Sequence, residues 1–166
     1  TRLNKIEDLE VAELACYADA NNPSIKSVPW KVYPNKPLPT DPLFNAYNSN
    51  ASAQFGDHSF NNVLLDFQPD VVMDIRDWWM IEFEQRSPFR DFFHWAIMPT
   101  VDATPQDVQW VNTYSSADAV FAYSEFGRDT LLKQCDSINF VDIASPAASK
   151  CFTPVADKRQ HKSDMG

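Results

Sequence analysis

The stretches DVVMDIRD at residues 70–77, FFHWAIMPTVD at residues 92–102 and AVFAYSE at residues 119–125 decide the fold of this chain. None of the three alternates cleanly between apolar and polar residues. Near-continuous apolar runs of this length are typical of strands that are covered on both faces in a parallel sheet. We therefore predict three parallel strands. Each one ends on polar or charged residues, and we expect function at those endings.

A helical pattern precedes the first of these strands. Phe60, Val63, Leu64 and Phe67 recur at spacings i, i+3, i+4 and i+7, so they form one apolar stripe along a helix. Pro69 follows directly and is expected to end this helix. The pattern indicates one helix that feeds one strand.

Two more helices are expected between and after the strands. Thr104 is expected to cap a helix that has Pro105 in its first turn and Asp107 three residues after the cap. The inner face of that helix is expected to consist of Val108, Val111 and Tyr114 or Ser115. Ser124 is expected to cap a second helix, which carries Phe126, Leu131, Leu132 and Cys135.

The alternation of strand and helix with short connections predicts an α/β layer fold. We expect a Rossmann-like parallel sheet flanked by helices, with right-handed crossovers. Residues 1–155 are expected to form this domain. Residues 156–166 are mostly polar, and we expect them to be a solvated linker or tail.

Residues 21–57 differ in character from the rest of the chain. Six prolines lie between positions 23 and 42, and they are interleaved with aromatic residues such as Trp30, Tyr33 and Phe44. Proline at this density breaks regular structure, but a disordered linker would lack the aromatic residues. We therefore expect an ordered, irregular excursion that packs on the sheet or lines a cleft.

Composition limits the class of protein. The 166 residues are 44% apolar, which suits the core of one domain. The net charge of -9 argues against broad contact with nucleic acid or with an anionic membrane surface. No apolar run approaches the roughly 20 residues of a membrane helix. Cys16, Cys135 and Cys151 show no metal-binding spacing, so we expect no metal site, reduced thiols and a cytoplasmic protein.

Glycine is scarce, with three residues at positions 56, 127 and 166. A phosphate-binding loop needs two or three glycines close together, because backbone amides must approach the phosphate. The chain has no such loop. We therefore expect neither a nicotinamide cofactor site nor a P-loop, and no cofactor held by this chain.

Three further segments carry a resemblance to a known family. They are FQPDVV at residues 67–72, ADAVFAYSEFG at residues 117–127 and SPAASKCFTP at residues 145–154. In this order they resemble the landmarks of GT-B glycosyltransferases, especially the retaining family 4 enzymes. The resemblance covers roughly residues 9–155 and implies an amino-terminal, acceptor-side domain of such an enzyme.

The third segment departs from the family pattern, because it lacks the glycine and the acid usual there. Family members usually begin with a strand and a glycine-rich loop, and they continue into a carboxy-terminal domain that binds the nucleotide-sugar donor. The resemblance implies that both elements lie outside this chain. It also implies transfer of a sugar, with retention, from a nucleotide diphosphate to the hydroxyl of a sugar or another acceptor. The groups that stabilise the leaving phosphate would then belong to the other domain.

Open α/β sheets bind ligands outside the carboxyl ends of their strands. The residues that close the three strands, in pairs, are Arg76 and Asp77, Thr100 and Asp102, and Ser124 and Glu125. We expect these residues to bind substrate, with Trp78 stacking against a sugar face. The family often places a histidine after the second strand, and Asp102 falls near that position. Asp102 is therefore the expected catalytic residue.

A structural role competes with a functional one for several of these residues. Asp74 can pair with Arg76 or Arg90, and His94 can be a hydrogen-bonded core residue. Trp78 and Trp79 can belong to the core, and Trp95 is expected there. Asp102 can also be a charge stabilised by the dipole of a helix that begins at Pro105.

Two other functions compete with sugar transfer. A serine hydrolase with Ser124 as nucleophile is disfavoured because the segment lacks the glycines of G-x-S-x-G, so Ser124 is better explained as a helix cap. The alternative that stays open is a non-catalytic ligand-binding or interaction module. In such a module Asp74, Asp77 and Asp102 could gather a divalent cation.

Overall fold

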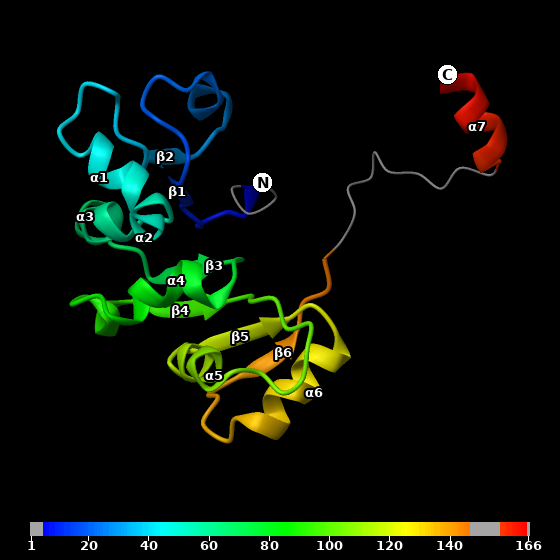
Figure 1. Cartoon of the computed structure of the whole chain (residues 1–166). Helices are drawn as coiled ribbons and strands as arrows, with labels where there is room; N and C mark the ends of the chain where they lie inside the picture. The colour runs from blue at the N-terminus through cyan, green and yellow to red at the C-terminus, as the bar shows by residue number, and fades with distance from the viewer. Residues whose placement is uncertain (1–4, 147–156, 166) are drawn as a thin grey trace.

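The computed structural model describes residues 5–146 and 157–165. It is an α/β structure built on two parallel sheets (Figure 1). The larger sheet has the strand order β3-β4-β5-β6, and its strands are Val71–Asp74, His94–Ile97, Ala119–Ala122 and Val141–Ile143. The three predicted strands are thus confirmed within their predicted stretches. The prediction missed β6.

The register of the larger sheet sorts its residues onto two faces. Val72 lies beside Trp95, and Ile97 lies between Asp74 and Val120. Trp95, Ile97 and Val120 are fully buried and form the centre of the core. Helices α4 (Trp78–Gln85), α5 (Val108–Ser115) and α6 (Glu125–Gln134) contribute Ile81, Tyr114 and Leu131 to the same core. Three crossover helices therefore cover one face of the sheet, as right-handed connections that advance in one direction require.

Helix α3 (Asp57–Phe67) confirms the helix predicted ahead of the first strand. Phe60 and Leu64 of the predicted stripe are buried against the core, and Phe60 packs edge-on against Phe83 and Phe93. Gly56 precedes the helix with φ of 117°, a conformation that disfavours any side chain. Gln68 ends it in the left-handed region, ahead of Pro69.

Helix α5 corrects the predicted helix start. Its N-cap is Asp107, whose carboxylate accepts a hydrogen bond from the Gln109 amide at 2.8 Å. Residues 104–106 lie outside the helix, so the predicted cap at Thr104 is wrong. Of the predicted inner face, Tyr114 is buried as expected, whereas Val108 is 73% exposed and the buried Thr113 was not predicted. Thr104 and Asp107 are both residue types that cap helices, and the helix uses Asp107.

The smaller sheet pairs β1 (Ala12–Ala15) with β2 (Lys31–Pro34). Strand β2 lies inside the predicted irregular excursion, which also contains the 3-10 helix η2 (Pro23–Ser27) and the short helices α1 (Phe44–Ser49) and α2 (Ala51–Gln54). The excursion is ordered, as expected, but it is more regular than its prolines indicated. Pro34 ends an edge strand, where a missing amide hydrogen costs no ladder bond.

Buried Asn35 connects the excursion to the rest of the domain, because its side-chain amide donates to the Cys16 carbonyl and its side-chain oxygen accepts from the Ser59 hydroxyl of α3. The same amide donates to the carbonyls of Ala53 and Gln54 within the excursion. At the other end of the chain, α7 (Lys158–Met165) is exposed along its whole length. The prediction of a solvated tail did not include this helix. Most of the third family-like segment, together with Cys151, lies outside the described residues.

Candidate functional site

A cleft of about 250 Å³ opens beyond the carboxyl ends of β3 and β4. Its lining combines two carboxylates, three indoles and one hydroxyl, from Asp77, Asp102, Trp78, Trp79, Trp110 and Thr100. Four of the seven residues predicted from the sequence therefore meet in one place: Asp77, Trp78, Thr100 and Asp102. We call this the Asp77–Asp102 cleft.

Short connections position these residues. Asp77 is the N-cap residue of α4, three residues after β3, and Trp78 begins that helix. Thr100 and Asp102 lie in the loop after β4, which ends at Ile97. Because β3 and β4 are adjacent and parallel, their carboxyl ends bring both loops to the same edge of the sheet. Trp110 reaches the cleft from the first turn of α5.

The two carboxylates act on the same buried phenol. Burial raises the pKa of Tyr114 above its ordinary value, and the negative charges of Asp77 and then Asp102 raise it further. Tyr114 is 1% exposed and does not line the cleft, and the raised pKa keeps its phenol protonated. Asp102 is exposed and Asp77 is half-buried, so both can accept hydrogen bonds from a ligand. Sequence reasoning placed Tyr114 on the inner face of its helix but gave no sign of this relation.

The aromatic side of the cleft is built from tryptophans. The rings of Trp78 and Trp110 stack with centroids 6.1 Å apart and an interplanar angle of 25°. Trp79 packs edge-on against Phe55 at 5.0 Å and is 45% exposed. These three side chains are thus partly accessible, and the proposal that they belong wholly to the core is wrong for Trp79. Trp95 is fully buried, as expected.

Asp102 is too far along the chain from α5 to be its N-terminal charge. The helix begins at Val108 and is capped by Asp107. The alternative in which the dipole of a helix beginning at Pro105 stabilises Asp102 is therefore wrong. The Asp102 carboxylate is exposed and does not cap α5, so it is accessible to a ligand.

The cleft contains no cationic lining residue. Its two carboxylates therefore give it a negative field that disfavours a diphosphate and suits neutral hydroxyl groups. Within the described residues, no three His, Cys, Asp or Glu side chains cluster as metal ligands would.

Arg76 lies elsewhere, at the bottom of a groove between β1 and β3. Its guanidinium forms a bidentate ion pair with Asp74, and Nη1 donates to the Phe55 carbonyl at 2.8 Å. Nη2 also lies 3.3 Å from the Glu84 carboxylate. This confirms the pairing of Asp74 with Arg76, and the donor groups of Arg76 are engaged within the protein rather than lining the Asp77–Asp102 cleft.

Glu84 is the notable residue that sequence reasoning missed. It is 2% exposed, and its Oε2 accepts the indole hydrogen of Trp95 at 2.5 Å. Burial raises the pKa of Glu84 well above its ordinary value, and the neighbouring Asp74 carboxylate adds to this shift. Burial also raises the pKa of the Cys16 thiol beside Arg76, so that thiol stays protonated. The cluster thus holds the two sheets together and lacks an activated nucleophile.

Ser124 and Glu125 do not line the Asp77–Asp102 cleft. Ser124 is the N-cap of α6, where its hydroxyl accepts the Gly127 amide at 3.3 Å, so the predicted cap is confirmed. Glu125 is the first residue of α6 and is exposed. Its charge suits the positive end of the helix, a role that needs no ligand.

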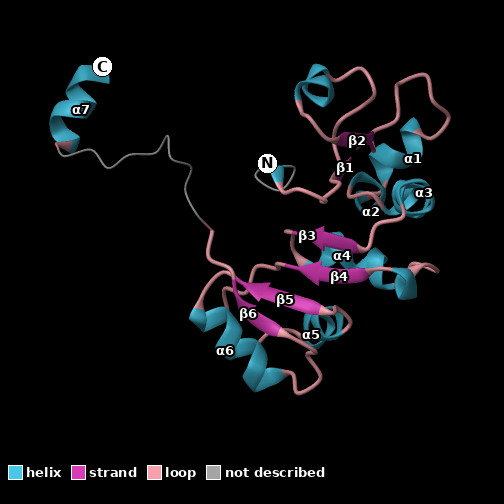
Figure 2. Cartoon of the chain, turned by 180° about the vertical axis from the view of Figure 1, so that it is seen from behind, coloured by secondary structure: helices cyan, strands magenta, loops and turns pink. Residues whose placement is uncertain are grey.

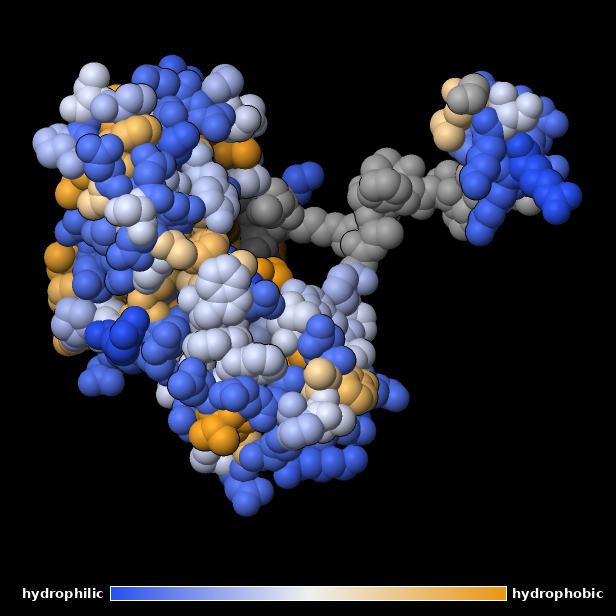
Figure 3. Space-filling view, in the orientation of Figure 1, coloured by the Kyte–Doolittle hydropathy of each residue, from blue (hydrophilic) through white to orange (hydrophobic). Residues whose placement is uncertain are grey.

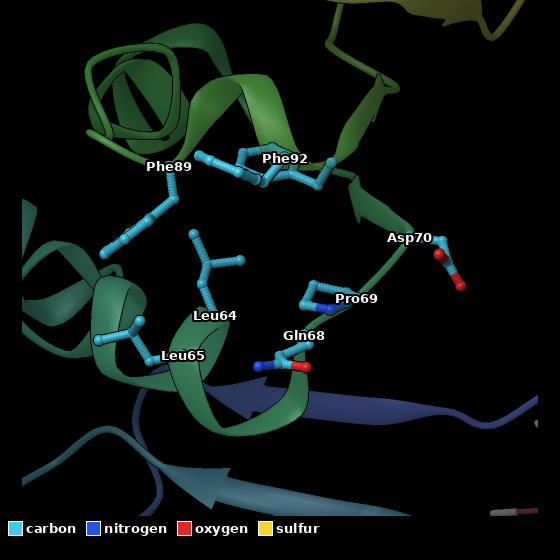
Figure 4. A pocket seen from close by; sticks show the side chains of 8 residues that line it. Leu64, Leu65, Gln68, Pro69, Asp70, Phe89 and Phe92 are labelled. Carbon is cyan, nitrogen blue, oxygen red and sulfur yellow. The ribbon is translucent and has the colours of Figure 1, made fainter.

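Two other hollows lie toward the opposite ends of the strands. An apolar one of about 450 Å³ has Leu64, Pro69 and Phe89 on its walls (Figure 4). A polar one of about 600 Å³ contains His94 and the ion pair of Arg90 with Asp118. His94 is exposed there, so its expected place in the core is wrong. Neither hollow combines acids with accessible indoles as the Asp77–Asp102 cleft does.

Comparison with protein-family models, with curated proteins and with solved structures finds no match for this chain. Among the described helices, none has the length and apolar character needed to span a bilayer. On its helix-covered side the surface is mostly hydrophilic, with hydrophobic residues scattered between (Figure 3).

Proposed function

We propose that this chain is the acceptor-binding α/β domain of a glycosyltransferase, and that the Asp77–Asp102 cleft receives a sugar or another hydroxyl-bearing acceptor. The observation that carries the proposal is the meeting of two carboxylates with Trp78, Trp79 and Trp110 at the carboxyl ends of adjacent parallel strands. The cleft lies where open α/β sheets bind ligands.

The chemistry of the lining supports a polyhydroxylated ligand. Carboxylate oxygens only accept hydrogen bonds, so the carboxylates of Asp77 and Asp102 select groups that donate, such as sugar hydroxyls. Indole rings offer flat apolar faces of the kind that cover the C–H face of a sugar ring. Asp102 is the more exposed acid, and in our proposal it accepts a hydrogen bond from the hydroxyl that attacks the anomeric carbon.

The charge of the cleft supports a donor site elsewhere. Sugar transfer breaks the bond between the anomeric carbon and a phosphate oxygen, and the leaving diphosphate needs cationic or helix-end groups. No cationic residue lines the cleft. We propose that a further domain of the polypeptide binds the nucleotide-sugar donor. In this proposal the enzyme is cytoplasmic, which the free thiols of Cys16 and Cys135 support.

The lack of cationic residues in the lining of the cleft also favours a second candidate function, a ligand-binding module without catalysis. Such a module would bind saccharides in the cleft with no nucleotide sugar consumed. The two candidates share the ligand class and differ in turnover. Release of nucleotide diphosphate by the complete polypeptide separates them.

Asp102→Asn in the complete polypeptide tests the proposed role. A hydrogen bond to a charged group contributes about 1.5–3 kcal/mol, so we expect sugar transfer to fall by roughly tenfold to a hundredfold. Asp136→Asn is the matched control, because Asp136 is an exposed acid after α6, outside the cleft. Thermal unfolding of both variants should match the wild type. Undiminished transfer by Asp102→Asn would remove this residue from the mechanism.

A further inference from the structure

The apolar hollow and the polar hollow at the amino ends of the strands adjoin each other. The apolar hollow, of about 450 Å³, and the polar hollow, of about 600 Å³, share Asp70, Phe92 and Phe93 in their linings. In Figure 2 the tails of the β3 and β4 arrows mark this end of the sheet, and their heads point toward the end where the Asp77–Asp102 cleft lies. We call the two hollows together the Phe92 surface. It lies at the opposite end of the sheet from the cleft, so an interaction there does not depend on sugar binding.

The centre of the Phe92 surface is an exposed aromatic side chain. Phe92 ends the 3-10 helix η3 (Arg90–Phe92) and is 79% exposed, more than any other large apolar side chain in the described part of the chain. Leu65 of α3 also lines the apolar hollow and is 57% exposed. Figure 4 shows Phe89 and Phe92 on one side of this hollow and Leu64 on the other. Large apolar side chains exposed around a hollow are typical of a surface that another molecule covers.

The polar hollow carries an excess of negative charge. Its charged lining groups are the carboxylates of Asp70, Asp91 and Asp118 and the guanidinium of Arg90, and His94 is the remaining titratable group. Arg90 is already paired, because Nη2 lies 2.9 Å from the Asp118 carboxylate and both Nη atoms donate to backbone carbonyls. Asp70 and Asp91 are exposed, and neither has an ion-pair partner among the described residues. The hollow therefore suits a cationic group.

These features describe a partner that is both apolar and basic. A large apolar side chain suits the apolar hollow, and a Lys or Arg side chain suits the unpaired carboxylates of Asp70 and Asp91. Phe92 lines both hollows, so a ligand that covers it must extend into each one. Neighbouring side chains of one polypeptide segment can do this. The net charge of -9 for the whole chain also attracts a basic partner.

We propose that the Phe92 surface binds a basic segment of another protein. A large apolar side chain of that segment packs against Phe92 in the apolar hollow, and a Lys or Arg side chain a few residues away faces Asp70 and Asp91. Two other occupants fit less well. A second copy of this chain would bring the same acidic residues together in a two-fold contact. An anionic membrane would be repelled by them.

A random peptide library displayed on phage and selected against residues 1–166 tests the proposal. We expect the enriched peptides to combine a large apolar residue with Lys or Arg a few positions away. Synthetic copies of these peptides are then titrated, and binding is followed by fluorescence anisotropy. Phe92→Ser should weaken binding by roughly tenfold or more. Asp91→Asn should weaken it by roughly threefold to tenfold at low salt and by less at high salt, because salt screens exposed charges.

The matched controls change the same residue types outside the Phe92 surface. Phe126 is 48% exposed on α6 and Asp136 is exposed after that helix, and neither lines the two hollows. Phe126→Ser and Asp136→Asn should therefore leave peptide binding unchanged. All four substituted sites are exposed, so thermal unfolding of the four variants should stay close to that of the wild type.

Several results would overturn the proposal. Enriched peptides without basic residues, or a library that gives no enrichment over the Phe92→Ser variant, would contradict the assignment of a basic partner. Binding that Phe92→Ser leaves undiminished would place the peptides elsewhere on the molecule. Self-association in sedimentation velocity that Phe92→Ser abolishes would assign the surface to a second copy of the chain. Binding to vesicles of anionic lipid that the same substitution abolishes would assign it to a membrane.

Discussion

Replacing Glu84 with glutamine tests how the buried carboxyl group between the two sheets affects stability. Glu84 is 2% exposed, and burial followed by the charge of Asp74 raises its folded-state pKa well above the ordinary value of 4.5. Between those two pKa values the folded protein retains a proton that the unfolded chain has released. The contribution of Glu84 to the free energy of unfolding is therefore fully present below pH 4.5, and it decreases as the pH rises toward the folded-state pKa. The slope approaches about 1.4 kcal/mol per pH unit.

Glutamine has the shape of the protonated carboxyl, and its oxygen can accept the Trp95 indole hydrogen, but it does not titrate. We expect Glu84→Gln to match the wild type within about 1 kcal/mol near pH 4.5. Above that pH its advantage should grow by up to about 1.4 kcal/mol per unit until the folded-state pKa is passed. Urea unfolding followed by circular dichroism from pH 4.5 to 8 measures this difference.

Glu82→Gln is the matched control on the same helix. Glu82 is only half-buried, so Glu82→Gln removes a carboxylate from this helix and leaves the buried Glu84 in place; the loss of stability that Glu84 causes with rising pH should persist in this variant. Two results would refute the account of Glu84. One is a constant difference between Glu84→Gln and the wild type across the range, and the other is a difference that favours the wild type as pH rises.

Two further predictions concern packing in α6, and urea unfolding measures both. Leu131 is fully buried, so Leu131→Ala should lower the free energy of unfolding by about 2–5 kcal/mol. Leu132 is 53% exposed, so Leu132→Ala should change it by no more than about 0.5 kcal/mol. Similar losses in the two variants would contradict the assignment of Leu131 to the buried face of α6. A Cβ at Gly127 would lie 3.3 Å from the Ala122 Cβ and 3.4 Å from the Val101 Cβ. Gly127→Leu should therefore overpack this contact and lower the free energy of unfolding by about 1–3 kcal/mol. An undiminished stability would show that α6 does not lie this close to β5.

The strands and the helix before them could be predicted because their patterns are local. Apolar runs indicated the parallel strands, and the stripe through Phe60 and Leu64 indicated α3. The expectation that the strands are covered on both faces is wrong for β3, because Val71 and Met73 are more than half exposed. The sequence placed Asp77 and Asp102 after two of the strands, but only the pairing of β3 with β4 shows that the two carboxylates meet in one cleft.

Features that depend on tertiary contacts were not predictable in this way. Glu82 and Glu84 stand two residues apart in the same apolar helix, and only burial against Trp95 distinguishes them. The pairing of Arg76 with Asp74 was one of two possibilities in the sequence, but the position of Arg76 in the groove beside β1 was not indicated. Strand β2 was hidden by prolines, because an edge strand tolerates a proline that a central strand would not.

Titration of the protein with saccharides, followed by fluorine NMR, tests the central claim most directly. The chain has five tryptophans, which can be replaced by 5-fluorotryptophan and assigned by single Trp→Phe variants. If the Asp77–Asp102 cleft binds an acceptor sugar, some members of a panel of neutral mono- and disaccharides will shift the signals of Trp78 and Trp110. Trp30 directly precedes β2, and its indole donates a hydrogen bond to Glu13 of β1, so its signal should not shift. Signals of Trp78 and Trp110 that no saccharide moves, or that move no more than that of Trp30, would contradict the assignment of this cleft.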